Sequence, residues 1–403
     1  MTLRIGYGWV VIASLWCANI FVVLTGFTLG ILLPDIQAEF ELNPVELGLL
    51  GSAFFLGFAS FSLPSSLWLS RYNPRLVTLL LTGGSSIFLF IQGWAPVFWV
   101  LLAGRFLFVA LSVGRATPEV MLIHQWFEPH KVARVLSINF SALGIGQTIS
   151  LALGPTLLNA LGNWHNVYYL FGCGMLCATL IWYLFGREHP DSHVEEGDRG
   201  LMAPLKVLRE HRALWLVALC QVGASITFAS FMTFWPSFMI DTRDMTIERI
   251  GPLFSLYPIG GFIGTSIAGI VSERIRRRKP IVWVSGLFLP FLYTVLVTTD
   301  NEMALAGALF FAGFFAFIVI PIVMTIPFDM RLNPREIAVA MGLSRTFTPL
   351  AATAGPLLVG IIYQISGSLL LALYVVVPMP FFMALIGVLL PETNPSRIGI
   401  APK

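Results

Sequence analysis

Charged residues are scarce in this sequence, and their scarcity excludes a soluble protein. Asp, Glu, Lys and Arg make up only 11% of the 403 residues, whereas hydrophobic residues make up 57%. Soluble domains average about 25% charged residues. The few charges present cannot cover the surface of a soluble globule, so the composition indicates a membrane protein with many spans.

Cysteine is also rare, and its placement excludes a disulfide framework or a zinc site. Cys17, Cys173, Cys177 and Cys220 each lie inside an apolar run, as small packing residues do. Paired carboxylates, a cluster of metal ligands and a nucleophile beside a base are all missing at membrane depth. We therefore expect no cofactor and no metal, and we disfavour a membrane enzyme or a sensor.

The apolar runs predict an all-α integral membrane protein with twelve transmembrane helices, since each crossing takes about 20 residues. A cleavable signal peptide is not expected, because the first run is too long and lacks a small-residue cleavage site. A polar linker, 187–212, divides the chain into two six-helix bundles, 1–186 and 213–403. The predicted spans cover residues 8–33, 46–69, 76–95, 97–124, 132–160, 165–186, 213–240, 250–271, 281–299, 303–328, 337–363 and 368–390.

The two halves also resemble each other in sequence. LGPTLLNALGN (153–163) in span five resembles AGPLLVGIIYQ (354–364) in span eleven, which aligns Gly154-Pro155 with Gly355-Pro356. These pairs bend helices or allow close packing. Internal repeats of this kind predict pseudo-symmetric bundles with a substrate site between them.

Lys and Arg concentrate on one side of the predicted spans. Of 24 such residues, 19 fall on the side of the two termini, and only Arg243 and Arg249 fall on the other. Cytoplasmic loops carry this excess in membrane proteins. We therefore expect both termini in the cytoplasm of a multi-pass protein of the cell (inner) membrane. The remaining three cations, Arg105, Arg115 and Arg345, lie within spans.

The loop GIVSERIRRR (269–278), between spans eight and nine, resembles the cytoplasmic signature of the major facilitator superfamily, Gly-x-Leu-Ala-Asp-Arg-x-Gly-Arg-Arg. Four family positions match, at Gly269, Arg274, Arg277 and Arg278. Glu273 replaces the family aspartate, and Arg276 stands where the second glycine is usual. In that superfamily the loop acid is thought to pair with basic residues and lock one conformation, which Glu273 would do here.

The first-half copy of this loop, SLWLSRYNPR (66–75), is degraded. Arg71 and Arg75 survive, but Ser70 replaces the acid. The resemblance therefore implies a gating role for Arg71 and Arg75, and for the two Gly-Pro pairs, while the lock in the N-terminal half is in doubt.

Further resemblances run along the whole chain. Arg105, in AGRFL, matches the superfamily's arginine of span four, and Pro391-Glu392-Thr393 closes the last span. YGWVV (7–11), LPDIQAEF (33–40) and QWFEPHKVARV (125–135) look most like the oxalate/formate and monocarboxylate carriers. The anion:cation symporters are a second possibility. The resemblance implies the major facilitator fold, alternating access of the two bundles, and a monomer.

Span four carries three charged residues, Arg105, Arg115 and Glu119. Each costs about 2.5–3.5 kcal/mol if it faces lipid, so these side chains should face the bundle interior or a water-filled cavity. On one continuous helix, Arg115 and Glu119 lie within about 80° of Arg105, and their i, i+4 spacing allows an ion pair. Two structural alternatives stay open: Glu119 simply neutralises Arg115, and Arg105 is a hydrogen-bonding post between spans.

Arg345 lies in span eleven with no acid near it in that span. A guanidinium binds a carboxylate through two parallel hydrogen bonds, and the resembled oxalate/formate carriers use a basic residue of span eleven for their anion. Three arginines against Glu119 leave a positive interior. Arg345, Arg115, Arg105 and Glu119 are therefore the candidate substrate residues. Polar side chains that could assist them are Asn19, Asn139, Gln147, Gln221, Tyr257 and Tyr363.

These observations favour a secondary active transporter of a small mono- or dicarboxylate. The alternative is an exporter of hydrophobic or cationic compounds, which the net positive interior disfavours. Expected partners are the anion, the lipid bilayer and either a proton or a counter-anion, with no nucleic acid. Glu119 is the best acid for proton coupling, but permanent pairing with Arg115 would instead favour anion exchange or facilitated diffusion.

Overall fold

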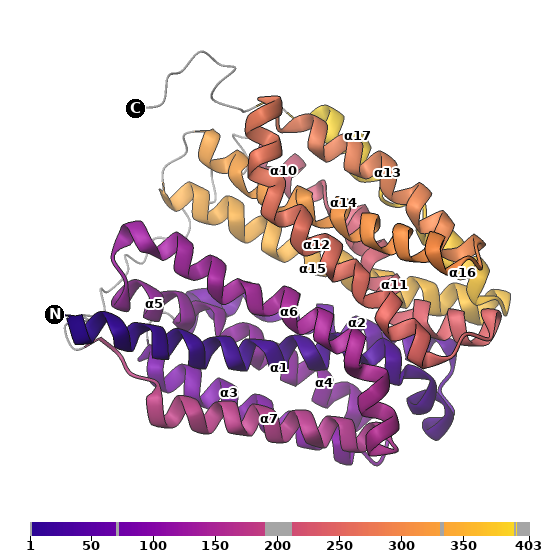
Figure 1. Cartoon of the computed structure of the whole chain (residues 1–403), viewed down its shortest axis with the longest axis horizontal. Coiled ribbons are helices and arrows are strands. Elements are labelled where there is room, and N and C mark those ends of the chain that lie inside the picture. Colours follow the sequence, from indigo (N-terminus) through magenta and orange to yellow (C-terminus); the bar gives the residue numbers. More distant parts are fainter. Residues whose placement is uncertain (1, 70–71, 190–211, 331–333, 391, 393–403) are drawn as a thin grey trace. The chain divides into compact units, whose positions relative to one another are not determined.

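The computed structural model describes residues 2–69, 72–189, 212–330, 334–390 and 392, and every element it describes is a helix (Figure 1). Twelve helical stretches in that part of the chain are long and apolar enough to cross a membrane. The predicted all-α membrane fold is therefore confirmed. The helices are α1 (Thr2–Phe40), α2 (Pro44–Trp68), α3 (Pro74–Trp94), α4 (Phe98–Gly114), α5 (Ala116–Trp126), α6 (Pro129–Leu161), α7 (Trp164–Phe185), α10 (Arg212–Leu219), α11 (Val222–Arg243), α12 (Ile247–Ile275), α13 (Lys279–Thr298), α14 (Glu302–Asp329), α15 (Pro334–Ser366), α16 (Leu369–Val376) and α17 (Phe381–Leu389).

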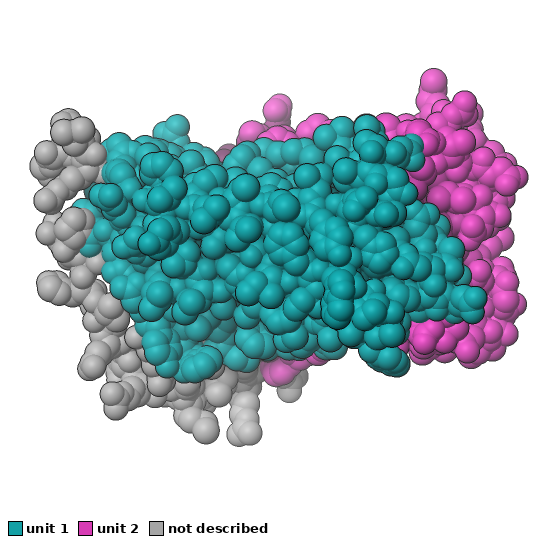
Figure 2. Space-filling model, turned by 90° about the horizontal axis from the view of Figure 1, so that it is seen from below, with its two compact units in different colours: residues 1–42, 53–197 teal, residues 43–52, 198–403 magenta. Residues whose placement is uncertain are grey.

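The chain forms two compact units, which are coloured separately in Figure 2. Unit 1 comprises residues 1–42 and 53–197, and unit 2 comprises residues 43–52 and 198–403. Helix α2 is thus shared, because its first turns belong to unit 2 and the rest to unit 1. The predicted division into bundles 1–186 and 213–403 stays a prediction.

Local sequence signals fix where several helices of unit 1 begin and end. Asn73 caps α3 by accepting a hydrogen bond from the backbone N–H of Leu76, and Asn163 caps α7 in the same way. Side-chain caps of this type satisfy backbone donors that a helix leaves free. Gly162 ends α6 with a φ of 78°, a left-handed conformation that glycine adopts without steric cost.

Glycines set the closest helix contacts of unit 2, where α12 packs along α14. A Cβ atom on Gly260 would lie 2.0 Å from the carbonyl oxygen of Phe310, and one on Gly313 would lie 1.8 Å from that of Tyr257. The two backbones can approach this closely only because both residues lack a side chain.

The two Gly-Pro pairs occupy comparable places in their units. A Cβ on Gly154 of α6 would meet Ile31 of α1 at 2.6 Å, and a Cβ on Gly355 of α15 would meet the Ile226 carbonyl of α11 at 2.3 Å. Pro155 and Pro356 are both buried within continuous helices. Each pair therefore lies where span five or eleven packs against the first span of its own half.

Span four is interrupted, which the sequence pattern did not predict. Helix α4 ends at Gly114 and α5 begins at Ala116, with Arg115 between them. Pro118 has no N–H for the Gly114 carbonyl four residues earlier, and the Arg115 N–H bonds back to the Ser112 carbonyl at 3.3 Å. Spans seven and twelve are likewise split, the former between α10 and α11 and the latter between α16 and α17.

Candidate functional site

Two charged side chains of span four lie inside unit 1. Arg115 and Glu119 are only 1% and 5% exposed. Arg115 Nη2 lies 3.6 Å from Glu119 Oε1, so the ion pair allowed by the i, i+4 spacing is present. Each charge thereby offsets part of the other's desolvation cost.

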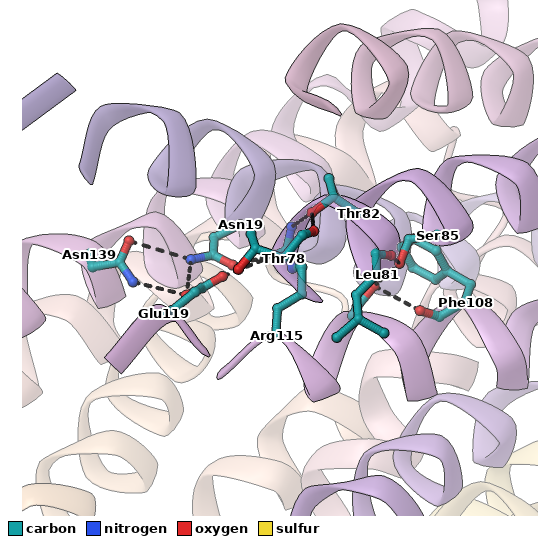
Figure 3. Close-up of polar contacts among 10 residues, drawn as sticks. Asn19, Thr78, Leu81, Thr82, Ser85, Phe108, Arg115, Glu119 and Asn139 are labelled. Carbon is teal, nitrogen blue, oxygen red and sulfur yellow. Dashed lines mark hydrogen bonds and ion pairs between the residues drawn. The ribbon is translucent and has the colours of Figure 1, made fainter. Parts of the chain in front are cut away.

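Two asparagines join this pair to the neighbouring helices (Figure 3). Arg115 Nη2 donates to Asn19 Oδ1 at 2.6 Å, and Asn19 Nδ2 donates to Glu119 Oε2 at 3.0 Å. Asn139 Nδ2 donates to the same carboxylate oxygen at 3.1 Å. Asn19 comes from α1 and Asn139 from α6. Both asparagines were among the polar side chains expected to assist the arginines, but no sequence pattern ranked them above the others.

Hydroxyl groups of α3 extend the network on the other side of the guanidinium (Figure 3). Thr82 Oγ1 accepts from Arg115 Nη1 at 3.4 Å, and the Ser85 and Ser112 hydroxyls are 3.2 Å apart. Thr78 is also buried on this helix. Sequence reasoning placed Ser112 on the same face of span four as Arg105, Arg115 and Glu119, but it missed the hydroxyl groups of α3. The signal that could have found them is the spacing of Thr78, Thr82 and Ser85, which puts hydroxyls on one face of an otherwise apolar span.

The cluster has unused hydrogen-bonding capacity. Arg115 Nε, Glu119 Oε1 and Thr78 Oγ1 are buried, and none has a hydrogen-bond partner among the described residues. A buried polar atom without a partner costs about 1–3 kcal/mol. An arrangement with a free guanidinium N–H and a free carboxylate oxygen is chemically suited to a polar ligand or a proton.

Arg105 lies apart from this cluster. It is 2% exposed, it donates from Nη2 to the Gly26 carbonyl of α1 at 3.0 Å, and its guanidinium lies 5.6 Å from the ring centre of Phe54 of α2. Arg105 and Arg115 both donate to α1, to the Gly26 carbonyl and to Asn19 respectively, and the shared face of Arg105 with Arg115 and Glu119 stays a prediction. These contacts tie α4 to α1 and α2, but Arg105 Nε and Nη1 are buried without a hydrogen-bond partner among the described residues, so a substrate role for Arg105 stays a prediction.

Two other predicted cations fall outside what the structure describes. Arg345 belongs to α15, but its side chain lies outside the described residues. Arg71 lies wholly outside them. An anion-binding role for Arg345 and a gating role for Arg71 stay predictions.

The loop between α12 and α13 is joined to its surroundings through Arg278. Its guanidinium pairs with Asp329 at the end of α14, and its backbone N–H donates to Glu392 Oε1 at 2.8 Å. Glu273, the predicted lock, is exposed and forms no ion pair with any described residue. The exposed residues of this loop also include Gly269, Arg274 and Arg277.

Arg75 forms the corresponding contacts in unit 1. Its backbone N–H donates to Glu188 Oε1 at 3.3 Å, and its guanidinium reaches the Tyr183 carbonyl at 3.5 Å. Trp182 Nε1 in turn donates to the Arg75 carbonyl at 3.1 Å. Arg75 thus joins the start of α3 to the end of α7.

Twelve helical stretches of the described chain are long and apolar enough to cross a membrane, and unit 1 holds a buried, hydrogen-bonded charge pair. The family model of the Major Facilitator Superfamily matches residues 15–331. The chain therefore belongs to the Major Facilitator Superfamily, and its homologues are transporters rather than enzymes.

Several relatives are named as transporters of organic anions. The chain is 24% identical over 380 residues to a hexuronate transporter of Bacillus subtilis (strain 168), covering 89% of this chain and 88% of the relative. It is 22% identical to a probable sulfoacetate transporter of Cupriavidus necator, covering 89% and 88%. It is 24% identical to a probable galactarate/D-glucarate transporter of Escherichia coli (strain K12), covering 83% of each.

Solved structures of low identity share the fold. A bacterial homologue of the human lysosomal transporter Spinster aligns with a TM-score of 0.78 at 17% identity, over 95% of each chain. A point mutant of the nucleoside transporter NupG aligns with a TM-score of 0.76 at 13% identity, over 94% of this chain and 99% of that one.

Proposed function

We propose that this protein is a secondary active transporter that moves a small mono- or dicarboxylate across the membrane by alternating access. The observation that carries the proposal is the Arg115 guanidinium, which is buried in unit 1 with its Nε–H free of any described partner. Hexuronate, galactarate/D-glucarate and sulfoacetate, which the relatives are named for, are all organic anions.

The chemistry of arginine supports this role. Its guanidinium stays charged, and its planar fork matches the two oxygens of a carboxylate. Unpaired guanidinium donors at membrane depth are costly, so they are rare unless a ligand uses them. In the proposal, Arg115 binds the anion, Arg345 adds a second cation from α15, and Arg105 holds α4 in place.

Glu119 determines the coupling in this proposal. An anion at Arg115 would lie beside the Glu119 carboxylate, and the two negative charges repel. A proton taken up by Glu119 removes that repulsion, which would couple anion entry to proton entry. If Glu119 instead stays ionised, exchange against a counter-anion is the natural mode.

Gating and orientation complete the proposal. Arg278 with Asp329 and Glu392, and Arg75 with Glu188, are proposed to hold the cytoplasmic ends of the helices in one conformation. The remaining proposed gating positions are Arg71, Gly269, Glu273, Arg274, Arg277, Gly154, Pro155, Gly355 and Pro356. The distribution of Lys and Arg supports cytoplasmic termini. We propose that the protein works as a monomer in the inner membrane.

Uptake into proteoliposomes tests the proposal. The panel holds labelled hexuronate, D-glucarate, sulfoacetate, simple mono- and dicarboxylates, and a hydrophobic cation, each with and without a pH gradient or a counter-anion. The variants are Arg115→Lys, which keeps the charge but loses the fork, and Arg345→Ala. Arg249→Ala is the matched control, because Arg249 is an exposed arginine in an ion pair with Glu302.

We expect carboxylate uptake by the wild type and by Arg249→Ala, and at least a tenfold loss in Arg115→Lys. The pH-gradient and counter-anion conditions then identify the coupling. Normal uptake by Arg115→Lys would remove Arg115 from the site. Transport of the hydrophobic cation, with no carboxylate moving, would overturn the proposal in favour of an exporter.

A further inference from the structure

Asn19 is placed between the two charges of the buried pair. Its Oδ1 accepts from Arg115 Nη2 at 2.6 Å, and its Nδ2 donates to Glu119 Oε2 at 3.0 Å. A carboxamide has nearly the shape of a carboxylate, with one oxygen replaced by an NH₂ group. The acceptor on Arg115 is therefore a neutral analogue of the chemical group that the proposed substrate carries.

The geometry of the guanidinium makes this contact informative. Nε–H and one N–H of Nη2 point the same way and form the side-on edge that receives both oxygens of a carboxylate. Of these two nitrogens, Nη2 donates to Asn19 Oδ1 at 2.6 Å, and Nε has no hydrogen-bond partner among the described residues. One nitrogen is therefore bonded to the carboxamide, and the other has a free N–H.

We propose that Asn19 is a specificity-determining residue that occupies the place of one substrate oxygen on Arg115 and must be displaced by the incoming anion. This inference rests on the proposed function. A carboxylate that replaces Asn19 gains the bond to Nε and the attraction of opposite charges. A ligand with a single neutral oxygen gains neither, so it does not displace the carboxamide.

The surrounding contacts make this displacement inexpensive for Glu119. When Asn19 leaves, Glu119 Oε2 keeps the hydrogen bond that Asn139 Nδ2 donates at 3.1 Å. Asn139 Oδ1 also lies 3.5 Å from Asn19 Nδ2, so the displaced amide has a second acceptor nearby. Arg115 keeps its contact with Thr82 throughout.

Displacement also separates two helices. Asn19 belongs to α1, whereas Arg115 lies between α4 and α5 and Glu119 lies in the first turn of α5. Replacing the Asn19 contact with the anion breaks a link between α1 and the second half of span four. Binding at Arg115 is thereby coupled to a change in the packing of α1.

Equilibrium binding to the purified full-length protein tests the inference, with a hexuronate, D-glucarate and sulfoacetate as probes in calorimetric titrations. Asn19→Ala removes the carboxamide that accepts from Arg115 Nη2. We expect the affinity for the probe that binds the wild type to rise about tenfold. Asn19→Asp puts a tethered carboxylate on Arg115, and we expect at least a tenfold loss. Asn166→Ala, an exposed asparagine at the start of α7, is the matched control and should match the wild type.

A residue that only supports the structure weakens binding when it is truncated, so a gain in Asn19→Ala distinguishes the two roles. Unchanged or weaker binding by Asn19→Ala overturns the inference, while loss of binding in Arg115→Lys leaves the proposed function standing. If Asn19→Ala does not fold, Asn19→Ser decides by the same criterion. Absence of binding by every probe, to the wild type and to the asparagine variants alike, overturns both.

Discussion

Arg115 and Glu119 persist inside a membrane protein because each charge offsets the other. Their charges are 3.6 Å apart, and amide and hydroxyl groups from α1, α3 and α6 supply further hydrogen bonds. Removing one member of a buried pair costs about 3–5 kcal/mol, because it leaves the other charge uncompensated. Replacing both members costs far less.

The pair therefore makes a prediction about stability. Glu119→Gln should lower the free energy of unfolding by about 3 kcal/mol, because Arg115 is left as an unpaired buried charge. The double variant Arg115→Gln/Glu119→Gln should recover most of that loss. Denaturant unfolding in detergent measures both values, and equal stability of the single and double variants would contradict the account.

Arg276 adopts a backbone conformation that suits glycine. Its φ is 53°, its N–H bonds to the Glu273 carbonyl, and its side chain is exposed. A left-handed conformation costs a residue with a side chain about 1–2 kcal/mol. The superfamily signature resembled by this loop has glycine at the same position, so the departure noted in the sequence has a structural consequence.

Arg276→Gly should therefore raise the free energy of unfolding by about 1 kcal/mol. Arg277→Gly is the matched control, because it removes the same charge from the neighbouring exposed position, where φ is not positive. The control should show no gain. Thermal unfolding of the two variants side by side decides the matter, and equal shifts would show that the effect comes from charge.

The residues of the cluster were only partly predictable. Charge at membrane depth identified Arg115 and Glu119, because it is costly wherever it occurs. Asn19 and Asn139 could be named but not ranked, since their contribution to the site depends on which helices pack together. Thr82 was missed, because a single hydroxyl in an apolar span usually bonds within its own helix, as Thr82 also does to the Thr78 carbonyl.

At the level of elements, hydropathy predicted the spans well but not their interruptions. Each of the twelve predicted spans overlaps one described helical stretch. The breaks in spans four, seven and twelve were missed, because hydropathy averaged over many residues does not register the loss of a single backbone hydrogen bond. Proline alone does not mark a break, since Pro155 and Pro356 lie within unbroken helices.

The break at Arg115 should matter for transport. Pro118→Ala restores an N–H that can bond to the Gly114 carbonyl, which should tighten the helix at Arg115 and shift its side chain relative to Asn19. We expect a folded protein with at least tenfold lower anion uptake in proteoliposomes. Pro290→Ala, in the continuous helix α13, is the control. Full activity of Pro118→Ala would show that the break is dispensable.

The packing of α12 on α14 gives a second prediction at this scale. Gly260→Ala and Gly313→Ala would each place a Cβ within about 2 Å of a backbone carbonyl of the other helix, so we expect each to cost several kcal/mol or to prevent folding. Gly307→Ala, on the same α14 helix, has nothing within 4 Å of its Cβ and is the control. Yields and unfolding temperatures measure the difference. Normal stability of Gly313→Ala would contradict the packing described here.

On the scale of the whole molecule, composition alone placed the chain in a membrane and the loop signature indicated its superfamily. The family match over residues 15–331 confirms that assignment. The substrate was harder to predict from the sequence. The charges within the spans indicate an anion, but the shape of a binding site depends on contacts that no sequence pattern reveals. The relatives are named for hexuronate, sulfoacetate and galactarate/D-glucarate, and these names select no substrate for this chain.

The central claim is that Arg115 binds the transported anion and is more than one half of a structural pair. Uptake by the double variant Arg115→Gln/Glu119→Gln tests it most directly, because that protein keeps no unpaired charge and should fold. The account predicts a stable protein, reconstituted at normal yield, that takes up no carboxylate above empty liposomes. Carboxylate uptake at the wild-type rate by this double variant would contradict the account, because the pair would then serve the fold alone.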